Sequence, residues 1–199
     1  MKLRTLVAVV VLAVATVSAH AQSQGKIGVY MNPVAIRISN VTPDVGPYAF
    51  LGQNSTSQVF YGYSLGGFYD FYRTAGGIVV GADMRLSDLH ANNAMLRSFL
   101  VGMRVSGQPF KRPIKPYAQI SFGVGTTKAP VSTVHISKGD FALYGGVDYT
   151  LARHVDFRVF ELGYGSLTTI SSATVGNGGI LNVPASTQIS FSSGLVFRF

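Results

Sequence analysis

Cysteine is missing from this chain of 199 residues. Disulfide bonds, catalytic thiols and thiolate-bound metal ions are therefore excluded. Charged residues are also scarce: they make up 12% of the chain, whereas about a quarter of the residues in a typical soluble domain are charged. The sequence is thus too apolar for an ordinary soluble protein of this size.

Long apolar runs are also lacking, apart from one near the N-terminus. After residue 21, no run reaches the roughly 20 apolar residues that a transmembrane helix needs. A strongly apolar composition without long apolar runs arises when apolar and polar residues alternate. Alternation is typical of β-strands that have one apolar face.

The N-terminus predicts export from the cytoplasm. Lys2 and Arg4 precede an apolar run from Leu6 to Val17, and Ala19-His20-Ala21 forms an A-x-A cleavage pattern. These features predict a cleaved signal peptide over residues 1–21 and a single mature domain over residues 22–199. A transmembrane helix is the alternative, but the run is too short and no stop-transfer charges follow it.

The charge balance is basic. The predicted mature chain keeps 14 basic and 8 acidic residues. The basic residues are scattered and form no dense run, which argues against a nucleic-acid partner. We interpret the surplus as attraction to anionic lipid headgroups or to lipopolysaccharide phosphates.

Alternation of apolar and polar residues occurs in eight segments. It is clearest in the last one, where Ile189, Phe191 and Leu195 share one face and Gln188 and Ser190 lie on the other. Side chains alternate between the two faces of a strand, so each segment predicts a strand with one apolar face. The eight predicted strands are 26–39, 58–71, 77–88, 95–106, 115–126, 138–151, 154–166 and 187–199.

Two of these segments are irregular. In 26–39 the apolar alternation changes phase near Pro33, and in 154–166 it changes between Val159 and Phe160. Proline cannot donate to a strand ladder, and an extra residue in one strand reverses its parity. We therefore expect a β-bulge at each of these two places.

The connecting segments alternate in length. The gaps 40–57, 127–137 and 167–186 are long, whereas 72–76 and 152–153 are tight. This rhythm is typical of membrane barrels with short periplasmic turns and longer external loops. The sequence therefore predicts an all-β fold: an eight-stranded antiparallel up-and-down transmembrane β-barrel, apolar side out, with both termini in the periplasm.

A soluble barrel of the lipocalin type is the alternative fold. Such a barrel turns its apolar face inward, and its polar face meets water and is expected to be rich in Lys and Glu. Here the polar face consists mainly of glycine, serine and tyrosine with isolated Asp and Arg. Aromatic residues on the apolar face, such as Tyr61, Tyr63 and Phe197, lie toward strand ends, as in the aromatic girdles of membrane barrels.

The last residues carry a resemblance to a known class. The terminal run GLVFRF, with Leu195, Phe197 and Phe199 at alternate positions, resembles the end of outer-membrane proteins. Together with the signal peptide and the eight strands, it makes the chain similar to the OmpA/OmpX-like family of small outer-membrane barrels. The resemblance implies location in the outer membrane of a Gram-negative bacterium. It also implies that these three residues form a signal for the barrel-assembly machinery.

The polar faces of the predicted strands carry several charges. A narrow eight-stranded barrel fills its interior with side chains, and buried ions there must be paired. We interpret these charges as a structural ion-pair network; the alternative is a narrow ion pore. The network is predicted from Asp83, Arg85, Arg104, Asp148, Asp156 and Arg158, with Asp70 on the same face and Glu161 uncertain because of the phase change.

Catalytic and metal-binding motifs are weak. His135-Ile136-Ser137 resembles the His-x-Ser pair of an outer-membrane lipid A deacylase family. The next acids, Asp140 and Asp148, are not clearly placed to orient the histidine, so no catalytic residue is predicted. His90 stands alone beside asparagines and predicts a turn rather than a metal site. Neither a cofactor nor a metal is expected.

These observations predict an integral outer-membrane barrel with a structural or surface-interaction role and no catalysis. A small passive pore for ions or small solutes is the alternative, and a lipid-modifying enzyme is the third. The expected partners are outer-membrane lipids and lipopolysaccharide, the barrel-assembly machinery, and an extracellular ligand of the loops.

Overall fold

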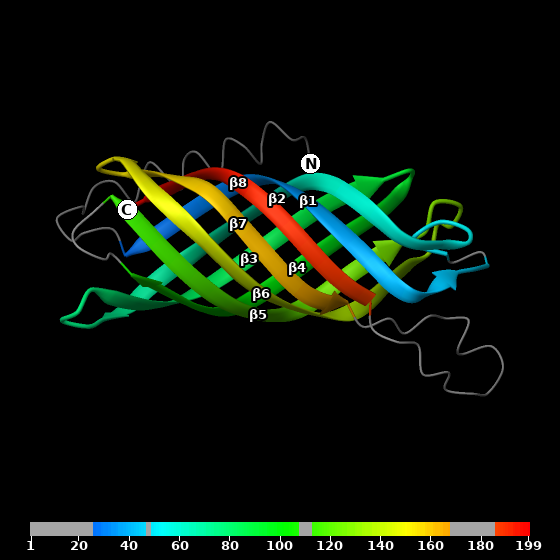
Figure 1. Cartoon of the computed structure of the whole chain (residues 1–199), viewed down its shortest axis with the longest axis horizontal. Coiled ribbons are helices and arrows are strands. Elements are labelled where there is room, and N and C mark those ends of the chain that lie inside the picture. The colour runs from blue at the N-terminus through cyan, green and yellow to red at the C-terminus, as the bar shows by residue number, and fades with distance from the viewer. Residues whose placement is uncertain (1–25, 47–48, 108–112, 168–185) are drawn as a thin grey trace.

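Eight antiparallel strands form a closed barrel in a computed structural model of the chain, which describes residues 26–46, 49–107, 113–167 and 186–199 (Figure 1). Each strand pairs with the next one along the chain, and β8 pairs with β1. The predicted fold class is therefore confirmed. The strands are β1 (Ile27–Asp44), β2 (Ser55–Arg73), β3 (Ile78–Ala91), β4 (Ala94–Gly107), β5 (Ile114–Lys128), β6 (His135–Ala152), β7 (Val155–Leu167) and β8 (Ser186–Arg198).

The two ends of the barrel differ in their connections. Both ends of the described chain and the tight turns around Thr74–Gly77 and Arg153–His154 lie at one end. Residues 45–46, 49–54 and 129–134 lie at the other end, which is the external one in barrels of this kind. The predicted signal peptide, residues 1–21, falls outside the described residues. No helix in the described part of the chain is long and apolar enough to cross a membrane.

The short connection between β3 and β4 is a two-residue turn. Asn92 and Asn93 have φ values of 46° and 66°. Positive φ at both central positions is the hallmark of a type I′ turn, which matches the twist of the strands that it joins. Asparagine tolerates this conformation better than most residues, so the turn chemistry expected after His90 is present.

One of the two predicted bulges is wrong. β1 pairs with β2 in unbroken register from Ile27 to Ser39, and its register against β8 is the same before Pro33, at Met31, as after it, at Val34. Its side chains keep alternating, but the apolar ones move from the outer face, at Met31, to the inner face, at Ile36. The phase change therefore marks a change of surroundings and not an extra residue.

The other predicted bulge is confirmed. The register of β7 against β8 shifts between Arg158 and Glu161. Val159 and Phe160 both face outward, with 43% and 38% of their surfaces exposed. The bulge returns Glu161 to the interior of the barrel, where it is buried.

Candidate functional site

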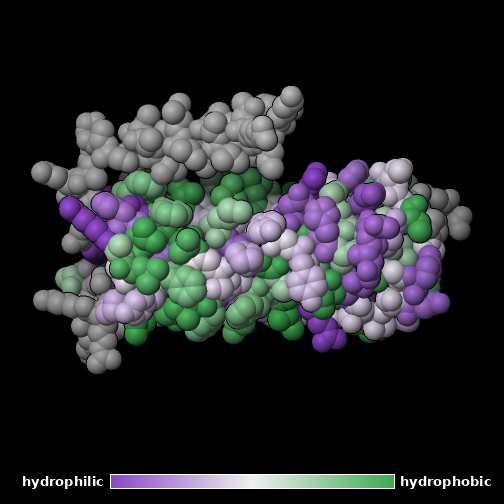
Figure 2. Space-filling view, turned by 90° about the horizontal axis from the view of Figure 1, so that it is seen from above, coloured by the Kyte–Doolittle hydropathy of each residue, from purple (hydrophilic) through white to green (hydrophobic). Residues whose placement is uncertain are grey.

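The outer surface of the barrel divides into two zones along its axis. Toward the periplasmic end, a belt of exposed apolar side chains surrounds the barrel. Toward the external end, the described outward positions become mainly polar. Figure 2 shows this division on one face, with hydrophobic residues over one half and hydrophilic residues over the other. The belt includes Met31, Tyr63, Met84, Val101, Phe122, Leu143 and Leu162; the polar zone includes Arg37, Asp88, His90, Arg97 and His135.

An apolar belt of this kind is the surface that a barrel presents to lipid. We call the part of the barrel inside the belt the membrane section and the part beyond it the external section. β1 crosses from one to the other near Ala35 and continues to Asp44. The predicted strand ends at residue 39, because the alternation of Val34, Ile36 and Ile38 stops there.

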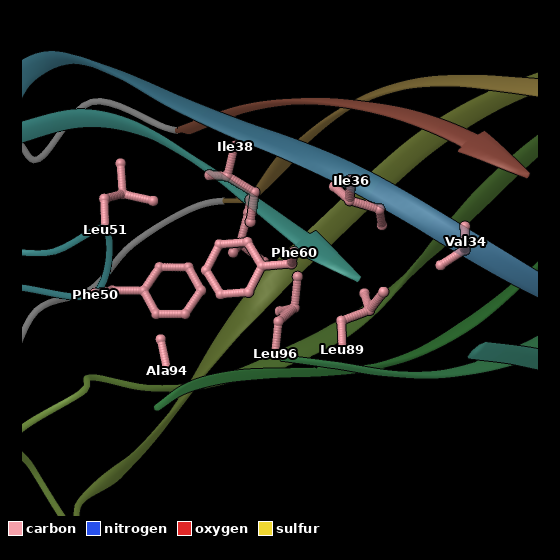
Figure 3. Packing of buried hydrophobic residues seen from close by; sticks show 10 residues of the cluster. Val34, Ile36, Ile38, Phe50, Leu51, Phe60, Leu89, Ala94 and Leu96 are labelled. Carbon is pink, nitrogen blue, oxygen red and sulfur yellow. The ribbon is translucent and has the colours of Figure 1, made fainter. Parts of the chain in front are cut away.

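The interior of the external section is an apolar core. Its buried side chains come from several strands and from the connection between β1 and β2 (Figure 3). Water surrounds this section, so its apolar side chains gain by turning inward, as in a soluble barrel. The core consists of Val34, Ile36, Ile38, Phe50, Leu51, Phe60, Leu89, Ala94, Leu96 and Leu167.

Two of these residues close the mouth of the barrel. Phe50 and Leu51 belong to the β1–β2 connection and are 6% and 2% exposed. The ring of Phe50 stacks on that of Phe60, with 4.8 Å between the centroids (Figure 3). The amide of Leu51 donates to the Asp44 carboxylate at 2.9 Å, which fixes the connection to the end of β1. We call Phe50 and Leu51 the plug.

A buried lysine lies beside the plug. Lys138, on β6, is 6% exposed, and its Nζ lies 5.6 Å from the centroid of the Phe50 ring. This position is in the external section, outside the membrane. Burial lowers the pKa of the Lys138 ammonium from its ordinary value of 10.5 to about 8, and the Asp44 carboxylate offsets part of that effect.

The interior of the membrane section is charged instead. Glu161 lies at its centre and accepts both guanidinium arms of Arg85, each at 2.7 Å. It also accepts from Arg158 at 3.1 Å and from the Tyr117 hydroxyl at 2.6 Å. The Ser192 hydroxyl donates to the same carboxylate at 3.0 Å. Five hydrogen bonds to one carboxylate replace the water that it gave up on burial.

Asp148 is the second centre of this interior. Arg104 donates to it at 2.7 Å and Arg158 at 3.0 Å, so Arg158 bridges Asp148 and Glu161. The guanidinium of Arg104 also lies over the Tyr117 ring, 4.0 Å from its centroid. These contacts form one connected ion-pair network across the lumen.

Asp83 is held differently. It accepts from the Tyr30 hydroxyl at 3.1 Å and from Gln119 at 2.6 Å. Its sequence neighbour Arg85 pairs with Glu161 instead. The structure thus brings Asp83 into the lumen without a direct ion pair within the described residues.

A third group of charges lies at the periplasmic end of the lumen. Asp156 pairs with Lys115 at 3.0 Å and also with Arg198. Arg198 reaches Asp70 at 3.3 Å as well. Lys115 and Arg198 were not among the predicted lumen residues, although Arg198 lies on the polar face of the last predicted strand.

The six lumen residues named from the sequence are all buried, at no more than 4% exposure. The structure joins five of them in ion pairs. It adds Glu161 to the network. The sequence left this residue uncertain, because the bulge in β7 decides whether its side chain faces the lumen or the outside. The charges of the network and of the periplasmic group balance: Arg85, Arg104, Lys115, Arg158 and Arg198 face Asp70, Asp83, Asp148, Asp156 and Glu161.

The histidine–serine pair lies on the outside of the barrel. His135 and Ser137 share the outer face of β6, in the external section. Ser137 Oγ lies 3.2 Å from Thr126 Oγ1. Among the described residues, no hydrogen bond joins His135 to Ser137 or to a carboxylate, and no cluster of three potential metal ligands occurs.

The residues of the expected assembly signal close the barrel. Leu195 and Phe197 face outward, each 41% exposed, within the apolar belt. The backbone amide of Phe199 donates to the carbonyl of Ile27 at 2.9 Å, and Ile27 donates back at 3.2 Å. The last residue therefore pairs with the first residue of β1.

Known proteins share this architecture. The family model described as the outer membrane protein beta-barrel domain matches residues 8–199. Neisserial surface protein A is 14% identical, with 87% of this chain and 97% of that chain covered and a TM-score of 0.56. The attachment invasion locus protein Ail of Yersinia pestis is 10% identical, with 89% and 100% covered and a TM-score of 0.52. No curated protein sequence matches the chain.

The two solved structures show the same fold, and the family model extends over nearly the whole sequence. The apolar belt, the closed ring of eight strands and this match agree on an integral membrane barrel. The chain belongs to the outer membrane protein beta-barrel domain family and is located in the outer membrane of a Gram-negative bacterium.

Proposed function

We propose that this protein is a closed outer-membrane barrel that acts through its external surface, in a structural or surface-interaction role and without catalysis. The observation that carries this proposal is that the lumen is obstructed at two levels. The ion-pair network around Glu161 fills the membrane section, and the plug and its apolar core fill the external section. We therefore expect no continuous path for water through the barrel.

The external section supports the second half of the proposal. β1 extends from the top of the belt near Ala35 to Asp44. At about 3.3 Å per residue and a tilt of about 45°, these residues raise the first external connection roughly 20 Å above the belt. The loops are therefore held beyond the lipid headgroups on a rigid, packed stem, where an extracellular ligand can reach them.

Ail, which is named as an attachment protein, has this fold. At 10% identity the likeness concerns the fold alone, so the proposed role rests on the geometry of this chain. Outer-membrane lipids and lipopolysaccharide are the proposed partners of the belt and of the polar zone above it. An extracellular ligand is the proposed partner of the loops.

Conductance in a planar lipid bilayer tests the closed lumen. We expect no stable channel from the wild type, and none from a Phe50→Ala/Leu51→Ala variant, because the charged network remains below the plug. The second candidate is a small passive pore, which the charged side chains of the lumen favour. Stepwise conductance of the wild type that changes in Asp83→Ala or Arg104→Ala would establish the pore and overturn the closed barrel.

A lipid-modifying enzyme is the third candidate. It would require His135 to activate Ser137 with help from a carboxylate. Ser137 is instead hydrogen-bonded to Thr126, and both lie on the outer face of the external section. Release of fatty acid from lipopolysaccharide by the wild type, and its loss in Ser137→Ala, would be the result in favour of the enzyme.

For assembly, we propose that Leu195, Phe197 and Phe199 form the signal that the barrel-assembly machinery recognises. Phe199→Ser should then reduce the amount of protein in isolated outer membranes far more than Phe122→Ser does. Each change removes one aromatic side chain from lipid, at a similar cost of about 1.5–3 kcal/mol. Cleavage after Ala21 serves as the control for export, and equal losses would contradict the signal.

A further inference from the structure

A groove on the outer wall of the barrel crosses β8, β1, β2 and β3. It has a volume of about 770 Å³, within the range of roughly 300–1,000 Å³ that small-molecule sites have. Ala35 lies in the groove between the aromatic side chains of its two strand neighbours, Tyr61 on β2 and Phe191 on β8. Pro33 lies beside Tyr63 in the same way. Small residues flanked by rings therefore give the groove its depth and its apolar lining.

The groove lies where the membrane section meets the external section. Tyr63 and Phe191 belong to the apolar belt, whereas Asp88 and His90, which also line the groove, belong to the polar zone. Its lower part thus faces lipid chains of the outer leaflet, and its upper part faces their headgroups. This lining therefore matches an occupant that has an apolar part and a polar part, rather than water or a purely apolar molecule.

Basic side chains gather at the upper end of the groove. Arg97 Nε and His90 Nε2 lie 3.2 Å and 3.1 Å from the same oxygen of Asp88. Arg37 is on the outer face of β1, two residues above Ala35, or about 7 Å along the strand. It donates to Ser57 Oγ at 3.4 Å and has no carboxylate partner among the described residues. Arg97 and His90 thus share one carboxylate, and Arg37 nearby adds a positive charge that no described carboxylate offsets.

We propose that this groove binds an anionic lipid of the outer leaflet, with an acyl chain over Ala35 and a phosphate held by Arg37 and His90. The apolar rings match the chain, and the surplus positive charge matches the headgroup. The site is on the outer wall, so binding there is independent of the closed lumen. Failure of the lipid site would leave the proposed role of the loops unchanged.

A second apolar depression provides an internal comparison. It has a volume of about 750 Å³ and is lined by Ile27, Gly67, Ala82, Met103 and other residues of the membrane section. No Lys, Arg or His is among its described lining residues. This depression should accept acyl chains without selecting a headgroup, because it has the apolar lining but not the cations.

Fluorescence quenching can test the site directly, because the chain contains no tryptophan. Tyr63→Trp places a single fluorophore in the groove, and Leu143→Trp places one on β6 as the matched control. Each protein is reconstituted in phosphatidylcholine vesicles that contain a small fraction of lipid with brominated chains. We expect brominated phosphatidic acid to quench the reporter at position 63 more than brominated phosphatidylcholine does, with no such preference at position 143.

Charge and space in the groove are then changed in the Tyr63→Trp background. Arg37→Gln should lower the relative association constant for the anionic lipid about fivefold, the factor for one basic side chain near charged lipid. Arg37→Lys should retain most of the preference, and Arg153→Gln, in the β6–β7 turn, should not change it. Ala35→Phe should reduce the quenching by both lipids, whereas Ala82→Phe, in the second depression, should not.

Heat-modifiable migration on a denaturing gel confirms that each variant is folded. Equal quenching by the two lipids at position 63 would overturn the site. An unchanged preference in Arg37→Gln, or the same preference at position 143, would also overturn it, because the attraction would then be a general property of the basic barrel.

Discussion

The membrane section and the external section are built from the same eight strands, but charged and polar side chains dominate the interior of the first and an apolar core lies inside the second. On β1, Met31 faces lipid while the buried Asn32 faces the lumen. Farther along the same strand, Arg37 faces water while Ile36 and Ile38 are buried in the apolar core. The alternation of side chains is identical in the two sections, and only the medium outside the wall differs.

The barrel is therefore stabilised in two ways. In the external section, the hydrophobic effect drives apolar side chains inward and seats the plug on Phe60. In the membrane section, most apolar side chains face lipid, and the lumen receives the charged ones together with a few apolar side chains such as Phe68 and Leu100. Buried charges are tolerated there because Glu161 and Asp148 each join several donors. Removal of a buried charge should therefore destabilise the protein in the membrane section and stabilise it in the external section.

The largest effect is expected at Glu161. Glu161→Gln leaves Arg85 and Arg158 without their shared countercharge, deep in the membrane section. Breaking a buried ion pair from one side costs about 3–5 kcal/mol, because the remaining charge stays buried. Urea unfolding of the barrel in detergent micelles should show a loss of this size. A loss below about 1 kcal/mol would mean that water reaches the network, and the contrast between the two interiors would then fail.

The next effect concerns the boundary between the sections. Met31→Lys puts a cation on the lipid-facing side of β1 and should cost about 2–4 kcal/mol, the value for the middle of a membrane. Ser39→Lys makes the same kind of change on the same face of the same strand, but beyond the belt. It should alter the unfolding free energy in vesicles by less than about 0.5 kcal/mol. Similar costs at both positions would move the membrane boundary beyond residue 39.

A smaller effect, of opposite sign, is expected at Lys138. The pKa of this buried amine is about 8 in the folded protein and 10.5 ordinarily, so the unfolded chain binds more protons between these values. Stability of the wild type should therefore rise with pH from about 8 to about 10.5, and the full cost of the buried charge remains at pH 7. Lys138→Met should stabilise the protein at pH 7 by on the order of 1–3 kcal/mol.

The measurement for Lys138 is urea unfolding at several pH values between 7 and about 10.5. The gain from Lys138→Met should shrink across that interval, because other titrating groups contribute equally to variant and wild type. Lys128→Met, on the outer face of β5, is the control and should show no such trend. A constant gain at every pH would mean that the methionine helps by packing alone.

The smallest effect is expected on the outer wall of the external section. Asp88 is half exposed and pairs with Arg97 and His90. Exposed ion pairs contribute about 0–1 kcal/mol, so Asp88→Asn should barely change the urea midpoint. Comparison with Glu161→Gln tests whether the contribution of an ion pair to the unfolding free energy depends on its position inside or outside the barrel wall. A loss as large as that at Glu161 would contradict the contrast.

Much of the fold was predictable from the sequence, because strand periodicity is local. A side chain at i and one at i+2 share a face in any strand, and lipid demands that one face be apolar. The bulge in β7 was predictable for the same reason, since Val159 and Phe160 are both apolar and adjacent. The phase change at Pro33 was detected too, but its cause was misread as a bulge.

Local patterns in the sequence are thus enough to predict the class of fold, the eight strands, the location and most of the charges that point into the lumen. Only the tertiary structure decided which charges pair: Arg85 is bonded to Glu161, 76 positions away, and not to its neighbour Asp83. It also decided that Phe50 and Leu51, two apolar residues in a connection, fill the mouth of the barrel. The ion pairs and the plug depend on which strands face each other across the lumen. Closure of the ring sets the distance between those strands, and no local sequence pattern encodes it.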